Sequence, residues 1–430
     1  MLSPISNVTR TTNAKIVLPF YIYAALSFLL ASILLWKHSD LIHSHHFNPH
    51  TLTITHIMAL GWGTMIILGA SYQLLSVIIE GELDSERFAY LSFGFLAIGI
   101  PILVYAFYIF HTGWLMQLGA VMINIGILFY VTNVLSSVFK KRKFSIFGLF
   151  IALSSLWLFA TTIIGLLLVF NFTKFILHSN SLEYLSLHAH VGIIGWFLLL
   201  VIGVSSRLIP MFMISKYSNT NLLWFILISL HVAIGAFIIS DRLSIKWIQR
   251  ISIFFILICL FLYLFYNYKA YKQRIRKKID WPVALSLLSN ALMILPVVLI
   301  FLFHQLNLKI LNNEIYILYG FQIFFGWLTA MILGMTFKTL PFIVWNIKYS
   351  KIAYKGKVPA PKDLFQNEIM ITMTISYILG FVLFIIGYLS NIIFMIKIGV
   401  LFLLVTAVLY NWNVFRIILH KKYNNGNKKQ

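Results

Sequence analysis

The chain has 430 residues, of which 60% are hydrophobic and only 10% are charged. A soluble domain averages about 25% charged residues, so this composition excludes a soluble globular protein. Apolar runs of about 20 residues recur along the chain, and this length crosses a bilayer core of roughly 30 Å as a helix. The sequence therefore predicts an all-α polytopic membrane protein.

The formal net charge of +22 does not indicate a nucleic-acid partner, because the basic residues gather in alternate loops, as membrane topology produces. A single cysteine excludes an intrachain disulfide and a cysteine-based metal cluster. Composition thus favours one transmembrane domain over residues 1–430, with the lipid bilayer as its main partner.

Twelve membrane-spanning helices are predicted. In chain order they cover about 16–36, 53–79, 88–110, 114–138, 145–170, 184–212, 221–240, 247–268, 281–303, 315–345, 367–388 and 392–418. The first has no obvious small-residue cleavage site, so it is predicted to be a retained helix and not a removed signal peptide.

Charge in the loops predicts the orientation. Lysine and arginine gather at 140–143, 269–278, 348–362 and 421–429, which all lie on one side. Because cytoplasmic loops carry this excess, we expect a cell-membrane protein with both termini in the cytoplasm. The loop with Glu80, Glu82, Asp84 and Glu86 falls on the same side, but acidic residues weigh little in this rule.

Three segments repeat one pattern, beginning at His56, His190 and Phe321. Gly, Trp and Gly recur at offsets 5, 6 and 13 from these residues, as Gly61, Trp62 and Gly69, then Gly195, Trp196 and Gly203, then Gly326, Trp327 and Gly334. The segments fall in the second, sixth and tenth helices. They predict three four-helix repeats, about 16–138, 145–268 and 281–418, around a pseudo-threefold axis.

The repeated small and aromatic residues are predicted mainly to pack helices. Glycines let helices approach closely in membranes, although close approach of a flat cofactor is an alternative. The tryptophans lie inside the spans, which favours core packing over an interfacial belt. Arg207 and Lys338 share offset 17, where the first segment has Gln73. We expect them to snorkel to lipid phosphates, with a haem propionate as the alternative ligand.

His56 and His190 are the main candidates for chemistry, because they occupy the same position in two segments while the third has Phe321. An imidazole inside an apolar helix is costly unless it is paired, hydrogen-bonded or ligating. Neutral imidazole is also a common ligand of metals and haem iron. The alternative for both residues is a hydrogen-bonded imidazole near the outer interface.

His188 and His231 are further candidate metal ligands. His188 and His190 lie two positions apart, which turns their side chains about 200° from each other on a helix. Both can face one metal only if the helix start is irregular. His231 lies within the seventh helix and can approach the sixth, with a hydrogen-bonded core histidine as the alternative. The predicted spans hold a single carboxylate, Glu368 at the start of 367–388, so a carboxylate proton path is not expected.

The first outer loop is rich in histidine, with His38, His43, His45, His46 and His50. Such tracts bind zinc or copper. No carboxylate or cysteine partner accompanies them at a fixed spacing, so a solvated loop is the alternative.

Twelve helices in three groups of four, with His56 before Gly-Trp in the second helix and His190 in the sixth, resemble subunit I of the haem-copper oxidase and nitric oxide reductase superfamily. The resemblance implies that His56 ligates a low-spin haem, and that His190 or His188 ligates an active-site copper or non-haem iron. It also implies an electron donor or second subunit as a partner. A weaker likeness is to a nitric-oxide-response family of haem- and copper-containing membrane proteins.

The ligand set is incomplete. The tenth helix of the family supplies two histidines, whereas residues 315–345 contain none here. The seventh helix of the family carries adjacent histidines, whereas only His231 is present. A complete haem–copper centre is therefore not expected, and whether the chain is an oxidoreductase is left open.

These observations predict an integral membrane protein that binds haem or copper with a reduced cofactor set. Electron transfer, gas-ligand binding and a nitric oxide stress response all fit that prediction. The alternative is a cofactor-free transporter, or a metal or haem assembly factor, on the same scaffold.

Overall fold

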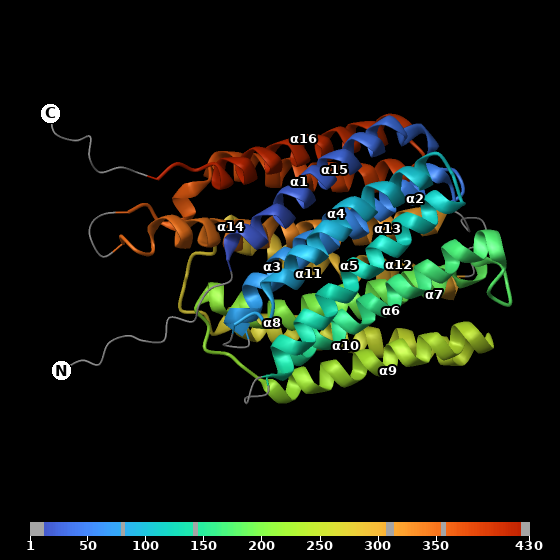
Figure 1. Ribbon diagram of the computed structural model, residues 1–430, viewed down its shortest axis with the longest axis horizontal. Coiled ribbons are helices and arrows are strands. Elements are labelled where there is room, and N and C mark those ends of the chain that lie inside the picture. The colour runs from blue at the N-terminus through green and yellow to red at the C-terminus, as the bar shows by residue number, and fades with distance from the viewer. Residues whose placement is uncertain (1–12, 79–81, 141–144, 307–313, 354–357, 423–430) are drawn as a thin grey trace. The chain divides into compact units, whose positions relative to one another are not determined.

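The structure is a computed structural model that describes residues 13–78, 82–140, 145–306, 314–353 and 358–422 (Figure 1). Its regular elements are helices, and twelve helical spans are long and apolar enough to cross a membrane. Part of the predicted topology signal lies outside the described residues, namely Glu80, Lys141, Arg142, Lys143, Lys355, Lys357, Lys428 and Lys429.

The α-helices are α1 (Ala14–Lys37), α2 (Pro49–His56), α3 (Met65–Ile78), α4 (Glu86–Tyr108), α5 (Trp114–Phe139), α6 (Ile146–Lys174), α7 (Leu185–His190), α8 (Leu199–Met213), α9 (Thr220–Leu243), α10 (Lys246–Lys272), α11 (Trp281–Leu292), α12 (Ile294–Leu306), α13 (Glu314–Phe321), α14 (Thr329–Tyr349), α15 (Asn367–Leu389) and α16 (Ile393–Ile418). Three π-helices, η2 (Ile57–Thr64), η4 (Val191–Leu198) and η6 (Gln322–Leu328), join α2 to α3, α7 to α8 and α13 to α14.

The predicted number of spans is confirmed, and the predicted ends lie within about one helical turn of the observed ends. The second span begins earlier than expected, at Pro49, because Asn48 caps it. The Asn48 Oδ1 atom accepts the Thr51 N–H at 2.9 Å, and proline is favoured at the first helical position.

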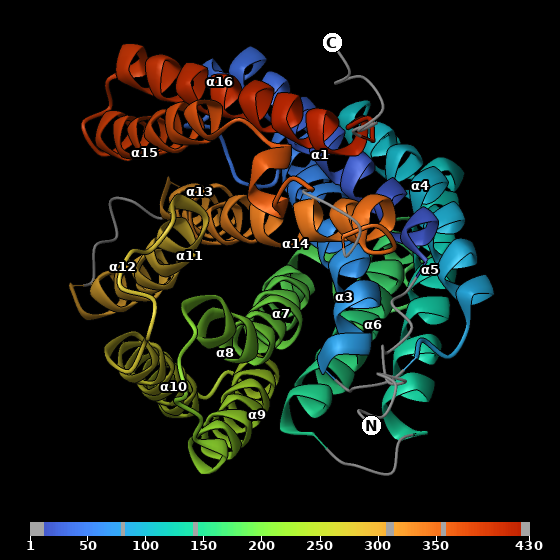
Figure 2. The same ribbon diagram turned by 90° about the vertical axis from the view of Figure 1, so that its left-hand side faces the viewer.

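The described chain divides into two compact units. The first comprises Met1–Ile16, Ala70–Lys278 and Met293–Leu308, and the second comprises Val17–Gly69, Ile279–Leu292 and Lys309–Gln430. In the first unit α4 packs along α5 and α9 along α10, and in the second α15 packs along α16 (Figure 2). The borders fall within α1 and α3 and between α11 and α12, so neither unit is a single predicted repeat.

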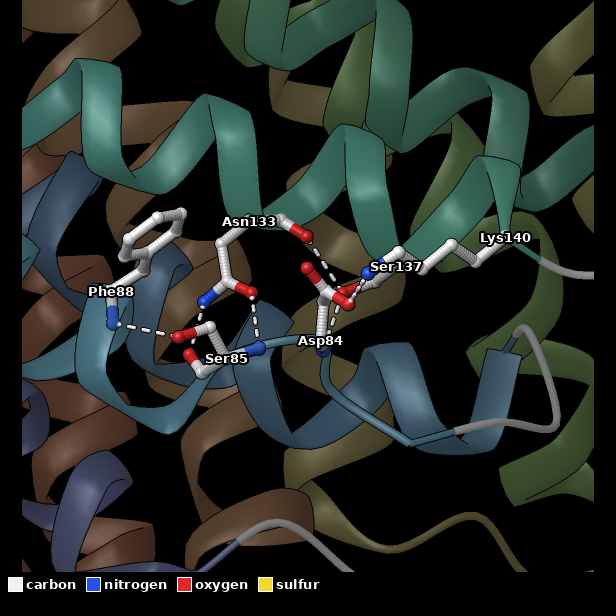
Figure 3. Close-up of polar contacts among 6 residues, drawn as sticks. All are labelled: Asp84, Ser85, Phe88, Asn133, Ser137 and Lys140. Atoms are coloured by element: carbon white, nitrogen blue, oxygen red, sulfur yellow. Dashed lines mark hydrogen bonds and ion pairs between the residues drawn. The ribbon is translucent and has the colours of Figure 1, made fainter.

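A polar cluster in the first unit fixes the start of α4 against the end of α5 (Figure 3). The Ser85 N–H donates to Asn133 Oδ1 at 3.0 Å, and Asn133 Nδ2 donates to the Ser85 carbonyl at 2.8 Å. The Asp84 N–H donates to Ser137 Oγ at 3.0 Å, and the Asp84 carboxylate pairs with Lys140. Asp84, from the acidic loop before α4, is therefore paired with Lys140, a basic residue that was predicted to lie on the cytoplasmic side.

All six repeated glycines stand where a side chain would clash. A Cβ atom would lie under 3.0 Å from Ser27 at Gly61, Phe20 at Gly69, Trp157 at Gly195, Phe150 at Gly203, Phe381 at Gly326 and Ser286 at Gly334. Except for Phe381 on α15, these neighbours belong to α1, α6 and α11. The repeated tryptophans Trp62, Trp196 and Trp327 are all at most 2% exposed. The predicted packing roles of both residue types are confirmed.

Candidate functional site

The first residue of each repeated segment lies at a junction between an α-helix and a π-helix. His56, His190 and Phe321 end α2, α7 and α13, and the next residue in each case begins a π-helix. Where the first two π-helices end, the Met65 N–H bonds to the Leu60 carbonyl, five residues back, and η4 closes in the same way. Such helices are rare and occur frequently at functional sites. The three positions therefore share an unusual backbone.

The His56 and His190 side chains make the same bond at this junction. His56 Nδ1 donates to the Leu52 carbonyl at 2.7 Å, and His190 Nδ1 donates to the Ser186 carbonyl at 2.9 Å. A carbonyl only accepts, so the proton of each neutral ring lies on Nδ1 and the lone pair lies on Nε2. Metal-ligating histidines are commonly oriented by this kind of bond. Both rings are half-buried.

His188 and His190 face different helices, as their spacing predicts. His188 Nδ1 donates to the Thr161 carbonyl of α6 at 3.0 Å, and its ring lies against Gly165 of the same helix. The His190 ring instead contacts the Phe237 ring of α9, with 4.7 Å between ring centroids. The helix start is regular enough that the two imidazoles do not converge.

His231 has both ring nitrogens engaged. Its Nδ1 donates to the Leu227 carbonyl at 2.8 Å, and its Nε2 accepts the indole N–H of Trp157 at 3.4 Å. This arrangement is that of a hydrogen-bonded core histidine. Within the described ranges, no three His, Cys, Asp or Glu residues gather as a metal site. The structure therefore does not bring His188, His190 and His231 together as one ligand set.

Asp241 is a charged neighbour of His190 that sequence reasoning missed. Its carboxylate interacts electrostatically with the His190 ring, and it follows Phe237 by one turn of α9. Asp241 also pairs with Arg242, whose Nε donates to Asp241 Oδ2 at 3.0 Å. The seventh span was predicted to end at 240, whereas α9 continues to Leu243. The helices that form the spans therefore do contain carboxylates near their ends: Asp241 in α9, and Glu86 and Glu368 in the first turns of α4 and α15.

The third segment replaces the imidazole with an aromatic cluster. Phe321 stacks on Phe384 of α15 with 3.5 Å between ring centroids, and it also contacts Phe325 and Phe381. Phe321 is buried. The same backbone junction thus carries a packing residue here and a bonded imidazole in the other two segments.

A second feature also recurs in the three segments. The hydroxyl residues Ser71, Ser205 and Thr336 all stand at offset 15, and they hydrogen-bond the hydroxyls of Tyr130, Tyr263 and Tyr410 respectively. These tyrosines lie on α5, α10 and α16, the fourth, eighth and twelfth spans. A hydroxyl residue at the same offset in all three segments is visible in the sequence and could have predicted this feature, but the sequence analysis did not use it.

At offset 17 the structure shows what surrounds the two cationic side chains, Lys338 and Arg207. Lys338 forms an ion pair with Asp280, just before α11, and its side chain is 15% exposed. The prediction that Lys338 reaches lipid phosphates is therefore wrong, because a carboxylate already holds its ammonium group. Arg207 lies over the Phe147 ring at 5.8 Å, near the start of α6.

The histidines of the loop between the first two spans form ring contacts within the second unit. The ring contacts join His38 to His50 at 3.7 Å, His43 to Tyr388 at 4.9 Å, His45 to His46 at 4.3 Å and His46 to Tyr316 at 5.0 Å. Four of these five histidines are half-buried and only His45 is exposed. The tract is therefore a packed cap and not a solvated loop.

Two of these imidazoles are shifted toward their neutral forms. Burial, the neighbouring His50 and Lys37 all lower the pKa of His38 below its usual value. Burial and His45 lower the pKa of His46 in the same direction. Neutral imidazoles can accept metal ions, but the described residues show no group of three ligands here either.

No protein-family model matches this chain, and no curated protein matches it.

Proposed function

We propose that this integral membrane protein binds haem and that the His56 imidazole would be one of the groups that hold the iron. The observation that carries the proposal is the bond from His56 Nδ1 to the Leu52 carbonyl at the junction of α2 and η2. It directs the lone pair to Nε2, the nitrogen through which an oriented imidazole ligates.

The residues around His56 fit such a group. The ring is half-buried within an apolar span, where a charged imidazolium is costly and the neutral ligating form is favoured. The following π-helix is closely packed, since a Cβ atom on Gly61 would lie 2.7 Å from Ser27 Oγ and Trp62 stacks on Phe28 with 4.7 Å between centroids. His56 is therefore held on a rigid support. A haem bound there would supply an iron centre for electron transfer or gas binding.

His190 is the second ligand in the proposal, for copper or for a further haem. Its Nδ1 bond repeats that of His56, and the Asp241 carboxylate adds negative charge beside the ring. His188 is oriented toward α6 and His231 is bonded on both nitrogens. The proposed metal set is therefore smaller than that of an oxidase subunit I.

We further propose that the chain is a divergent relative of oxidase subunit I built from three four-helix repeats, with both termini in the cytoplasm. The three π-helices and the three hydroxyl–tyrosine bonds at equal offsets support the repeats. Such a protein would take part in electron transfer, gas-ligand binding or a nitric oxide response, with an electron donor or second subunit as a partner.

One observation favours a second function, that of a transporter or a metal or haem assembly factor without a resident cofactor. The outer-loop histidines form a packed cap in which His38 and His46 favour the neutral, metal-accepting form. Delivery of a metal ion would use this cap and would not need His56.

The test compares alanine variants at equivalent positions. Full-length protein from haem-replete cells is purified as His56→Ala, His190→Ala and Phe321→Ala, and bound haem, iron and copper are measured per chain. We expect His56→Ala to lose haem, His190→Ala to lose its metal or second haem, and Phe321→Ala to keep both. Unchanged haem and metal in both histidine variants would contradict the proposal.

A glutamine version of all five outer-loop histidines separates the two functions. Under the haem proposal, the haem content stays unchanged in this variant. If the variant loses metal binding while native protein and His56→Ala contain no haem, the delivery function replaces the haem proposal.

A further inference from the structure

The ends of α14 and α16 lie at the same end of the second unit (Figure 1), and cationic groups converge there. Lys348, in the last turn of α14, donates from Nζ to the His420 carbonyl just beyond α16. The Tyr349 hydroxyl and His420 Nε2 lie 2.8 Å apart and hydrogen-bond. Arg416 lies in the last turn of α16 and is exposed. Two helix ends are thus joined around one imidazole.

Among the described residues, no carboxylate neutralises the positive charges of Lys348 and Arg416. Burial, Lys348 and Arg416 all lower the pKa of His420, which places both cations close to its ring. Lys338 and Lys397 in the same unit have carboxylate partners. No carboxylate of the described residues forms an ion pair with Lys348 or Arg416. The cluster therefore fits an anion supplied from outside the chain.

The surface beside the cluster is apolar and exposed. Trp412 is 61% exposed and Leu419 is 70% exposed, and both flank Arg416 at positions that share one helix face. In membrane proteins, exposed tryptophan is enriched at the level of the lipid headgroups. Arg416 thus has exposed apolar neighbours, which suits a ligand that presents a phosphate above its acyl chains.

We propose that Lys348, Arg416 and His420 form a binding site for the phosphate of an anionic phospholipid, whose acyl chains lie along the Trp412 face of α16. The planar guanidinium of Arg416 suits a phosphate because it donates two parallel hydrogen bonds. Lys348 adds a second positive charge held in place by the His420 carbonyl. Inorganic phosphate offers the same anion, but it gains nothing from the neighbouring apolar face. This site is independent of the proposed haem.

The test titrates purified full-length protein in neutral detergent with phosphatidylglycerol, and in parallel with phosphatidylcholine and inorganic phosphate, while the melting temperature is recorded. We expect phosphatidylglycerol to stabilise the protein more than either of the other two probes. An equal response to phosphatidylcholine would overturn the proposal. An equal response to inorganic phosphate would overturn the assignment to a lipid.

Charge-removing variants then locate the site. A single cation near the headgroups is worth about fivefold in affinity, so Arg416→Gln should weaken phosphatidylglycerol binding about fivefold and the double variant with Lys348→Gln about 25-fold. Lys397→Gln, near the other end of α16, removes the same charge and should leave this affinity unchanged. Unchanged affinity in the double variant would overturn the proposal.

The native protein gives a measurement that does not depend on the folding of any variant. Raising NaCl from about 0.1 M to about 1 M shortens the screening length from about 10 Å to about 3 Å. We expect phosphatidylglycerol binding to weaken by at least the fivefold effect of one charge. Binding that does not respond to salt would contradict an electrostatic site.

Discussion

The first and third repeated segments have the same backbone and different chemistry. Both pass from an α-helix into a π-helix at the same position and carry a buried tryptophan and two closely packed glycines. At the first position, His56 bonds to a carbonyl, whereas Phe321 stacks on Phe384. The π-helix therefore forms without an imidazole in the third segment, so this backbone does not itself require one. This difference supports the ligand role that we propose for His56.

The largest expected effect comes from making the first segment resemble the third. His56→Phe keeps an aromatic ring at the junction but removes the ligating nitrogen. Loss of an outer-shell partner alone weakens metal binding by about 10–100-fold, so loss of the ligand should lower haem affinity at least about 100-fold. Haem per chain measures the effect, with Phe321→Leu as the control. Full haem occupancy in His56→Phe would show that the two segments do not differ as claimed.

A smaller effect tests whether the glycines pack as tightly as the structure indicates. A Cβ atom on Gly334 would lie 2.5 Å from the Pro282 carbonyl oxygen, which cannot move as a side chain does. Gly334→Ala should therefore lower the free energy of unfolding by about 1–3 kcal/mol.

Gly320 provides the matched control, because nothing lies within 4 Å of a Cβ atom there. Gly320→Ala should be neutral or stabilising by up to about 1 kcal/mol, since alanine is the better helix former. Melting temperatures in one detergent compare the two variants. Equal effects at both glycines would remove the argument for close packing in the third segment.

The hydroxyl–tyrosine bonds predict a smaller and equal effect in two segments. Thr336→Val leaves the Tyr410 hydroxyl without this partner, and Ser205→Ala does the same to Tyr263. Each should cost about 1 kcal/mol of unfolding free energy, as a lost buried hydrogen bond does. Adding Tyr410→Phe to Thr336→Val should recover part of the loss. A large effect in one segment and none in the other would argue against equivalent repeats.

The smallest expected effect is a pH dependence of the histidine-rich loop. This loop precedes the first repeated segment, and no such tract precedes the third. The pKa values of His38 and His46 are lowered on folding, so the unfolded chain binds protons more readily. Their contribution to stability is full above the unfolded pKa of about 6.5 and is lost as the pH falls below it. Melting temperatures at several pH values should fall on acidification, and less steeply in a His38→Gln, His46→Gln variant. Identical slopes for both proteins would contradict this assignment.

Much of the fold was predictable because the bilayer imposes it. Span number and approximate ends follow from apolar length, and the positions of His56 and His190 at one repeat offset were readable directly. The divergence of His188 and His190 followed from helix periodicity alone. These features depend on local sequence, so local reasoning reached them.

Features that depend on distant partners were not predictable. The sequence next to His56 contains no signal that predicts a π-helix. The π-helix accommodates the packing of the Gly-Trp pair against other helices. Asp241 could not be linked to His190 from the sequence, because α9 was predicted to end at 240 and its interaction with His190 joins residues far apart in the chain. Lys338 was expected at the lipid headgroups because its partner, Asp280, is 58 residues earlier in the chain.

The most direct measurement is the visible spectrum of the native protein, purified in detergent from haem-replete cells, with iron counted per chain. The proposal predicts a Soret band that shifts when dithionite reduces the sample, with iron close to one equivalent or more per chain. A colourless protein without stoichiometric iron or copper would contradict a ligand role for His56 and leave the assembly or transport function in its place.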